Sequence, residues 1–516
     1  MSAPAAGGRV LIASNRGPLS FRAGQDGRLS AQRGGGGLVS GLSSVAADND
    51  VLWVCAALSD ADRMAAAAAP GGRLGLDGTQ GGTGVRLLNI PPAIFDAAYN
   101  KIANSALWFI QHLLYNTPQQ PQFTAAFHQD WGAFRTYSAA FAAALAADAG
   151  APGGTGTTRV LVQDYHLCLV PRMLAELRPG TAIAHFTHTP WAPPAYFRIL
   201  PDAVAKAVLD GMLGADHAGF LSQRWADAFL DCCEDILGAT VDRAAGQVSH
   251  RGHVTTVDVY PLGVDAAELI ARAAQPDVQE RAAALTVAAG GTRLIVRVDR
   301  AELSKNIVRG LAAFRELLIT YPQWRGQVTH LAFTYPSRTD LPEYRSYTAE
   351  IQRLAAGINE EFGTASCRPL MLEVVDDYAR SLAAYLLADV LLVNPIRDGM
   401  NLVAKEGPVL ARRGCAVVLS TEAGAADELG PHALLVNPYD VTATAEALHT
   451  ALAMNDFERQ QRSNALAQAA AAMPPQLWLA RQLAALAPKV PGPVTGRRPA
   501  GASASGAAGS AAGAGA

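Results

Sequence analysis

Short apolar segments alternate with longer helix-like segments along most of this 516-residue chain. Strand-like runs lie at 10–13, 51–54, 85–90, 160–162, 182–186, 218–221 and 257–260, and again at 294–298, 331–333, 370–375, 390–393, 416–419 and 433–436. This alternation is typical of α/β proteins, because parallel neighbouring strands need crossover helices between them. The sequence therefore predicts an α/β fold with two Rossmann-like, doubly wound domains that face a central cleft.

A hinge-like segment divides the two series of strands. It is Tyr260-Pro-Leu-Gly-Val-Asp265, and it predicts a first domain over 1–263 and a second over 264–487. From 488 to 516 the chain consists almost entirely of Pro, Gly, Ala, Ser and Arg. Such a segment buries too little apolar surface to offset the entropy lost on ordering. We expect a disordered tail without a catalytic role.

Composition excludes several classes of function. The 42 basic and 45 acidic residues give a formal charge of -3, which offers no electrostatic basis for binding nucleic acid or an anionic membrane. The six cysteines are scattered without CxxC or zinc spacing, which favours buried free thiols in a reducing compartment. No apolar run approaches the roughly 18 residues of a membrane span, so we expect a cytoplasmic protein. No motif in the sequence requires a metal, and we expect the protein to need neither a metal nor a cofactor.

The segment 390–406 (VLLVNPIRDGMNLVAKE) combines a strand, a glycine-containing turn and a helix that should start near Asn401. Unpaired N–H groups at such a helix start can bind an anion. Asp398 lies in the turn, and Lys405 and Glu406 lie about one helical turn further on. Judged on this segment alone, an ordinary strand-to-helix corner with a surface Lys-Glu pair explains the arrangement as well as an anion-binding site does.

Two earlier segments also suit ligand binding. Four glycines at 34–37 follow a strand and a polar loop, where backbone can approach a phosphate closely, although a flexible linker explains them better when taken alone. Tyr99 and Trp108 lie in a helix-like segment, and their rings suit a sugar face as well as a protein core.

Polar side chains follow several of the predicted strands. Asp164 and His188 each come directly after one, so both should project into the cleft. In the second half, Arg300 and Lys305 flank the start of a helix, where cations and free N–H groups can hold a diphosphate. Arg338, after the next strand, adds a third cation to the same rim. Asp164 could instead cap a helix, and Arg300 and Lys305 could instead be a basic pair exposed to solvent.

Taken in order, these segments resemble the trehalose-6-phosphate synthases, retaining glycosyltransferases of the two-domain GT-B architecture, over roughly residues 9–485. The matching positions are Ser14-Asn15-Arg16, Gly36-Gly37-Leu38, Tyr99 through Trp108, Asp164-Tyr165-His166, His188, Arg300 with Lys305, Ser337-Arg338 and 397–406. Two departures affect the expected loop shapes. Glu302-Leu303 and Asn306 replace an acidic-aromatic pair and a glycine, and Gln163 stands where a histidine is common.

The resemblance implies transfer of glucose from a nucleotide-diphosphate glucose to glucose 6-phosphate, with retention at the donor carbon and without an enzyme nucleophile. Its implied donor site comprises Gly36, Gly37, Arg300, Lys305, Asp398, Gly399, Met400, Asn401, Leu402, Val403, Ala404, Lys405 and Glu406. Its implied acceptor site comprises Arg16, Tyr99, Trp108, Asp164 and Arg338. The catalytic set would be Asp164, His188, Arg300, Lys305 and Asp398. A separate trehalose-phosphate phosphatase would act on the product, and homo-oligomerisation is left open.

Asp376 decides the expected donor base. Related enzymes that use UDP-glucose carry an aromatic residue about 22 positions before the aspartate of the Arg-Asp-Gly motif, and that position here is Asp376. A carboxylate can accept from both N1–H and the 2-amino group of guanine, whereas uracil offers one N–H. The sequence therefore favours GDP-glucose over UDP-glucose. Capping of the helix that begins near Tyr378 is the competing role, and a one-residue shift would exchange Asp376 for Asp377.

Other functions stay open at this stage. A sister activity of the same family, glucosylglycerol-phosphate synthase or a cyclitol-joining pseudo-glycosyltransferase, differs in its substrates. A glycoside hydrolase could use Asp164 and Asp398 as paired carboxylates, but it leaves Arg300, Lys305 and the glycine loop unexplained. An inactive sugar-phosphate sensor is the third alternative.

Overall fold

The structure of the protein, a computed structural model, describes residues 8–24, 28–33, 49–75, 84–150, 158–339, 341–364 and 367–487. The predicted tail at 488–516 and the loop with Gly36 and Gly37 lie outside these residues. Within the described ranges, no helix is both long and apolar enough to cross a membrane.

The first half of the chain forms a ten-stranded sheet in the order β10-β11-β12-β9-β8-β7-β1-β4-β6-β5. Its strands are β1 (Arg9–Ser14), β4 (Asp50–Ala56), β5 (Arg73–Gly75), β6 (Gly84–Leu88), β7 (Arg159–Gln163), β8 (Ala182–Thr187), β9 (His217–Phe220), β10 (Thr240–Asp242), β11 (Gln247–His250) and β12 (His253–Val259). All pairs from β12 across to β6 are parallel, and β5, β10 and β11 pair antiparallel at the edges. A separate hairpin joins β2 (Leu19–Ala23) and β3 (Leu29–Arg33).

Helical segments connect these strands. They are α2 (Asp60–Ala68), η1 (Pro70–Gly72), α3 (Pro92–Asp96), η2 (Ala97–Leu107), α4 (Trp108–Gln111), α5 (Ala125–Asp148), η3 (Tyr165–Leu167), α6 (Val170–Leu177), α7 (Pro194–Phe197), α8 (Asp202–Met212), α9 (Gln223–Cys232) and η4 (Cys233–Leu237). In β1, Val10, Leu11 and Ile12 have no exposed surface, as expected for a parallel strand covered on both faces.

The second half forms a six-stranded sheet, β15-β14-β13-β16-β17-β18, in which every pair is parallel. The strands are β13 (Arg293–Arg300), β14 (Val328–Tyr335), β15 (Leu370–Val374), β16 (Val390–Val393), β17 (Ala416–Ser420) and β18 (Leu434–Val436). Its helical segments are α10 (Ala266–Ala273), α11 (Pro276–Ala289), η5 (Leu303–Lys305), α12 (Ile307–Thr320), η6 (Pro322–Trp324), α13 (Pro342–Phe362), α14 (Tyr378–Leu387), α15 (Val403–Leu410), α16 (Ala426–Leu429), α17 (Val441–Ala453), α18 (Asp456–Ala471) and α19 (Pro475–Ala485). The α/β prediction with two mainly parallel sheets is confirmed.

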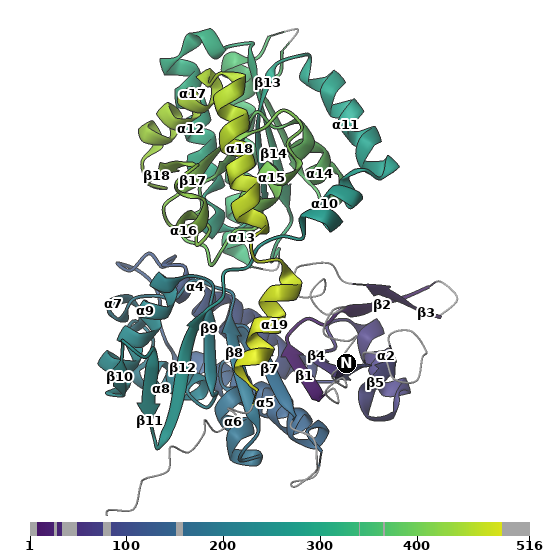
Figure 1. Cartoon of the computed structure of the whole chain (residues 1–516), viewed down its shortest axis with the longest axis vertical. Coiled ribbons are helices and arrows are strands. Elements are labelled where there is room, and N and C mark those ends of the chain that lie inside the picture. The colour runs from purple at the N-terminus through teal and green to yellow at the C-terminus, as the bar shows by residue number, and fades with distance from the viewer. Residues whose placement is uncertain are drawn as a thin grey trace, which may run out of the picture. The chain divides into compact units, whose positions relative to one another are not determined.

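The last helix, α19, returns to the first sheet, which the sequence did not reveal. It contacts β7, and Figure 1 shows it in yellow beside that strand. Trp478 on α19 is fully buried, and its Nε1 donates to the carbonyl of Tyr260 at 3.1 Å. The division at 263 and 487 stays a prediction.

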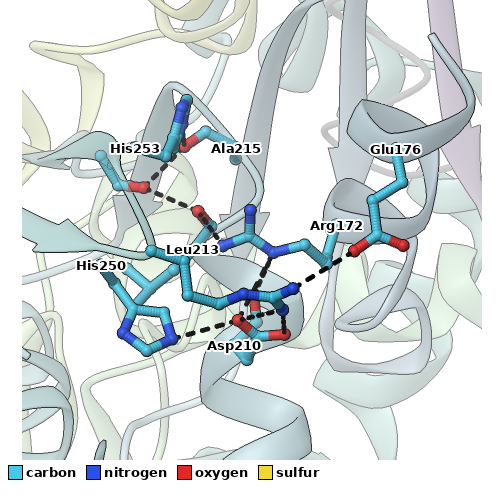
Figure 2. Close-up of polar contacts among 9 residues, drawn as sticks. Arg172, Glu176, Asp210, Leu213, Ala215, His250 and His253 are labelled. Atoms are coloured by element: carbon cyan, nitrogen blue, oxygen red, sulfur yellow. Dashed lines mark hydrogen bonds and ion pairs between the residues drawn. The ribbon is translucent and has the colours of Figure 1, made fainter. Parts of the chain in front are cut away.

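The antiparallel edge of the first sheet is attached to the helices by a polar cluster around Asp210, which Figure 2 shows. Arg251 Nη1 donates to Asp210 Oδ2 at 3.0 Å, and His250 Nε2 lies 3.2 Å from Oδ1. Arg172 Nε lies 3.5 Å from the same carboxylate, and its Nη2 donates to the carbonyl of Leu213 at 3.0 Å. The β11–β12 hairpin is thereby joined to α6 and α8.

Candidate active site

A cavity of about 740 Å³ lies at the carboxyl ends of strands from both sheets. It is lined by Ser14, Asn15, Arg16, Tyr99, Gln163, Asp164, His166, His188, Val298, Arg300, Tyr335, Pro336, Ser337, Arg338, Asp376, Tyr378, Ser381, Tyr385, Val403 and Glu406. Residues that follow β1, β7 and β8 thus meet residues that follow β13, β14 and β15. This is where open parallel sheets place ligands, because the connecting loops diverge there.

The first sheet contributes Asp164 and His188. The backbone N–H of His188 donates to Asp164 Oδ1 at 3.1 Å, and His188 Nε2 lies 2.9 Å from Gln163 Oε1. Burial alone would raise the pKa of Asp164, but its hydrogen bond with His166 and the nearby imidazole of His188 lower it to about 2. Burial lowers the pKa of His188. At neutral pH this edge therefore carries a fixed carboxylate beside a neutral imidazole.

Tyr99 and Trp108 have different positions. Tyr99, on the π-helical segment η2, lines the cavity and stacks on His166 with ring centroids 5.5 Å apart. Trp108 is 7% exposed and is not among the lining residues. The guanidinium of Arg338 lies 4.2 Å from its ring centroid, and that of Arg300 lies 5.7 Å away. Trp108 is therefore buried, and its ring lies close to the guanidinium groups of Arg300 and Arg338, which both line the cavity.

A buried carboxylate, Glu302, organises the same two cations. It is fully buried, lies 2.9 Å from the Arg300 guanidinium and accepts from Ser337 Oγ at 2.7 Å. Burial would raise the pKa of Glu302, but the charges of Arg300 and Arg338 hold it below its usual value. Arg338 Nη1 also donates to Tyr344 Oη at 2.5 Å, which fixes the guanidinium at the cavity wall.

Lys305 and Asp398 form an ion pair beside the cavity, and neither is a lining residue. Burial would raise the pKa of Asp398, but Lys305 lowers it. Asn401 Nδ2 donates to the same carboxylate at 3.1 Å. Lys305, which the sequence predicts to hold a diphosphate, is thus bonded to Asp398, which the resemblance assigns to the same donor site.

The turn before α15 is packed against the first half of the chain. A Cβ on Gly399 would lie 1.9 Å from the carbonyl oxygen of His188, so only glycine fits there. Trp225 Nε1 donates to the Gly399 carbonyl at 3.0 Å. Asn401 has a φ of +79°, and α15 begins at Val403, two residues later than predicted. The left-handed residue at 401 is incompatible with a helix that starts there.

The helix α15 divides the predicted donor residues between cavity and core. Val403 and Glu406 line the cavity. The side chain of Lys405 is fully buried, bonded to Glu428, and donates to the Leu262 carbonyl at 2.8 Å. Burial raises the pKa of Glu406 to about 7, although its hydrogen bond with Tyr385 opposes that shift. The remaining predicted residues of this stretch, Met400, Leu402 and Ala404, are not lining residues.

Adjacent aspartates after β15 have separate roles. Asp377 is the N-cap of α14, where it accepts from the N–H of Arg380, and it also pairs with Arg281 Nε at 2.8 Å. Asp376 is exposed and lines the cavity, and its carboxylate has no hydrogen-bond or ion-pair partner among the described residues. The helix cap is therefore Asp377, and Asp376 remains available to a ligand.

Sequence reasoning placed Arg16, Tyr99, Asp164, His188, Arg300, Lys305 and Arg338 near one cleft, and all of these but Lys305 line the cavity. It missed Tyr335 and the α14 side chains Tyr378, Ser381 and Tyr385. Their spacing of three and four residues puts the last three on one helix face, which was the available signal. Asn306, in place of a glycine, has a φ of +58°, so the backbone conformation that favours glycine is retained.

Within the described ranges, no group of three or more His, Cys, Asp or Glu side chains is placed to hold a metal ion. All six cysteines are free, and five of them are buried, in agreement with the thiol prediction. That the protein needs no metal or cofactor stays a prediction.

Two parallel α/β sheets with a shared cavity at their carboxyl ends define the GT-B class of architecture. The chain belongs to glycosyltransferase family 20, whose family model matches residues 8–487. Both the predicted family and the predicted fold class are thereby confirmed.

Three relatives illustrate this similarity. A probable α,α-trehalose-phosphate synthase (UDP-forming) of Arabidopsis thaliana is 32% identical over 461 residues, which cover 88% of this chain but only 54% of that protein. A validamine 7-phosphate valienyltransferase of Streptomyces hygroscopicus subsp. jinggangensis is 30% identical over 486 residues, covering 93% of this chain and 95% of that protein. The crystal structure of a UDP-forming α,α-trehalose-phosphate synthase from Burkholderia vietnamiensis has a TM-score of 0.79 at 28% identity, covering 93% of this chain and 99% of that one.

Proposed function

We propose that this chain is a retaining glucosyltransferase that transfers glucose from a nucleotide-diphosphate glucose to glucose 6-phosphate and forms α,α-trehalose 6-phosphate. The observation that carries the proposal is one cavity of about 740 Å³ that joins Arg16 of the first half with Arg300 and Arg338 of the second. That volume suits small-molecule substrates. The synthase names of two of the three relatives support the same reaction.

The donor would lie on the side of the cavity formed by the second half. Arg300 would hold the diphosphate. Lys305 would break its ion pair with Asp398 and bond to a phosphate oxygen instead. Asp398 is then released to accept from glucose hydroxyls, and the adjacent turn residues Gly399 and Met400 would lie against the same sugar. Glu406, next to Val403 in the cavity wall, would accept from the ribose hydroxyls. Charge on the departing diphosphate is stabilised by preorganised cations.

The acceptor would lie between the two halves. Arg16 and Arg338 would bind the 6-phosphate from opposite sides, since both line the cavity. Tyr99 would contact the glucose from the cavity wall, and the ring of Trp108 lies 4.2 Å from the guanidinium of Arg338. Charge-assisted contacts of this kind select the phosphorylated sugar over free glucose.

The chemistry needs no enzyme nucleophile. The bond from the donor sugar carbon to the diphosphate oxygen breaks, the acceptor hydroxyl oxygen bonds to that carbon on the same face, and the leaving phosphate takes the hydroxyl proton. Asp164 fixes the backbone of His188, and the neutral imidazole of His188 faces the cavity beside the reacting sugars. The protein then contributes mainly alignment and electrostatic stabilisation.

We further propose that GDP-glucose is the favoured donor, although two of the relatives are named as UDP-forming. The support is the carboxylate of Asp376 in the cavity wall, near Tyr378 and Ser381, to which no residue that the structure describes is bonded. It can accept two hydrogen bonds from guanine. GDP-glucose should have a higher kcat/KM than UDP-glucose, and Asp376→Asn should reduce the difference between the two kcat/KM values. Asp377→Asn is the matched control, because Asp377 caps α14. A wild-type preference for UDP-glucose would remove the base assignment and leave the reaction intact.

The decisive experiment combines the purified chain with glucose 6-phosphate and each nucleotide-diphosphate glucose in turn. Nucleotide release and the ¹³C NMR spectrum of the product are measured together. An α,α-1,1 linked disaccharide phosphate is expected. Release of free glucose with an unchanged acceptor would instead indicate hydrolysis. A cytoplasmic location and a separate phosphatase that acts on the product belong to the same proposal.

The valienyltransferase relative gives a second candidate, transfer of a cyclitol to a phosphorylated amino-cyclitol. An acceptor series of glucose 6-phosphate, glycerol 3-phosphate and validamine 7-phosphate with matched donors separates the two, because only the first acceptor supports trehalose 6-phosphate synthesis.

A further inference from the structure

A second cavity, of about 380 Å³, lies at the other end of the strands of the second sheet. It is lined by Gly291, Thr292, Arg293, Asp389, Arg413, Asp456, Arg459 and Gln460. Arg293 begins β13, and Asp389 immediately precedes β16. The cavity therefore lies at the amino ends of these strands, whereas Arg300 at the other end of β13 lines the candidate active site. A ligand bound in this second cavity would therefore be separate from a substrate bound in the candidate active site.

The three arginines of this cavity have unused hydrogen-bond donors. The guanidinium of Arg293 has no hydrogen-bond or ion-pair partner among the described residues. The Arg413 side chain is 71% exposed, and its one partner among the described residues is Asp389, in an ion-pair contact at 3.5 Å. Arg459 is 3% exposed, and its Nη1 is buried without a hydrogen-bond partner in the described part of the chain.

The cavity has a net positive charge, because its three arginines outnumber its two carboxylates, Asp389 and Asp456. Asp389 Oδ2 already accepts from the N–H of Leu294 at 2.8 Å. Asp456 accepts from Arg459 Nη2 at 2.7 Å and is otherwise exposed to solvent. Three guanidinium groups therefore face two carboxylates that are already bonded to the protein. A buried donor without a partner carries a desolvation cost, which a bound anion offsets.

We propose that this arginine-lined cavity binds a small anion that carries a phosphate group. Guanidinium groups match phosphate oxygens in a bidentate geometry, and arginine stays charged at any physiological pH. The volume exceeds what a bare phosphate ion fills, so the cavity also accommodates a short organic part. The inference does not depend on the proposed glucosyltransferase reaction.

The test is calorimetric titration of the full chain with inorganic phosphate and with glycerol 3-phosphate. Arg413→Glu should weaken binding of both probes at least tenfold. Arg412→Glu is the matched control, because Arg412 is exposed, bonds to Gln279 and does not line the cavity. Its variant carries the same charge change and should bind within about twofold of the wild type. Arg293→Gln should weaken binding without reversing a charge.

A further variant excludes the candidate active site as the place of binding. Arg338→Ala removes a cation from that site, and it should leave unchanged the binding event that Arg413→Glu weakens. The proposal fails when Arg413→Glu and Arg412→Glu bind equally, or when Arg338→Ala abolishes binding. Tighter binding of glycerol 3-phosphate than of phosphate supports an organic phosphate as the ligand, and equal binding supports the free ion.

Discussion

At the scale of single residues, the cavity depends on charged groups whose states are set by their immediate neighbours. Glu302 shows this most directly, because a fully buried carboxylate would be costly without Arg300 and Ser337 bonded to it. The sequence identified Arg300 by its place after a strand. It could not identify Glu302 as the group that orients Arg300, because the Glu302 carboxylate is itself held by a tertiary contact with Ser337 in the loop after β14.

Loss of Arg338 tests the acceptor assignment. Removing one charge-assisted contact to the 6-phosphate costs about 1.5–3 kcal/mol, so Arg338→Ala should lower kcat/KM for glucose 6-phosphate about 10- to 150-fold. Activity towards free glucose, which has no phosphate, should not fall. Arg315→Ala, which removes an exposed arginine paired with Glu361, serves as the control. Equal losses with both acceptors would contradict the assignment.

The pKa of Glu406 predicts how donor binding depends on pH. Burial raises this pKa to about 7, so the carboxylate is mostly protonated below that pH. Only the ionised form accepts freely from both ribose hydroxyls. Donor affinity should therefore rise as the pH increases through 7, and at pH 6 it should be about tenfold below its plateau. Donor KM measured between pH 5.5 and 8.5 tests this.

Glu406→Gln provides the comparison, because an amide does not titrate in this range. Its donor KM should be higher at pH 8 and nearly independent of pH. A wild-type profile without a change near pH 7 would show that Glu406 does not bind the donor in its ionised form.

At the scale of elements, the strands of the parallel sheets were predicted well and their antiparallel edges were not. The interior strands are continuous apolar runs because helices cover both faces. The edge strand β10, Thr240–Asp242, and the hairpin β2–β3 are short, partly exposed and mixed in composition, so they carry no such run. The return of α19 to the first sheet depends on Trp478 and Tyr260, which are far apart in the sequence.

The loop before α12 depends on Asn306. Its φ is +58°, and its Nδ2 donates to the carbonyls of Asn394 and Pro438 at 3.0 and 2.7 Å. Asn306→Ala loses both hydrogen bonds and adds left-handed strain, whereas Asn306→Gly loses only the bonds. Alanine should therefore reduce the free energy of unfolding by about 1 kcal/mol more than glycine. Urea denaturation of both variants measures the difference, and the reverse order would show that the strain is relieved elsewhere.

At the scale of the whole molecule, the turn at 398–401, which the resemblance assigns to the donor site, belongs to the second half of the chain but is hydrogen-bonded to the first half. Trp225, at the start of α9, donates to the Gly399 carbonyl, and two guanidinium groups lie close to its ring. Those of Arg224 and Arg397 are 4.5 and 4.3 Å from its centroid. Arg224 also donates to the carbonyls of Thr421 and Ala423. The two sheets are therefore coupled at the turn that carries Asp398.

This coupling gives the last prediction. Trp225→Phe keeps most of the ring but leaves the Gly399 carbonyl without its indole donor, which costs about 1–3 kcal/mol where the acceptor is buried. Because the turn loses its anchor, donor KM should rise and kcat/KM should fall about tenfold. Trp324→Phe is the matched control, since it also removes one indole N–H donor, which here bonds to His449, and neither Trp324 nor His449 lines the cavity. Its kinetics should stay within about twofold of the wild type. If both variants unfold at the same urea concentration and only Trp225→Phe loses activity, the first half positions the donor turn; equal activity in the two variants would show that the turn holds its shape without Trp225.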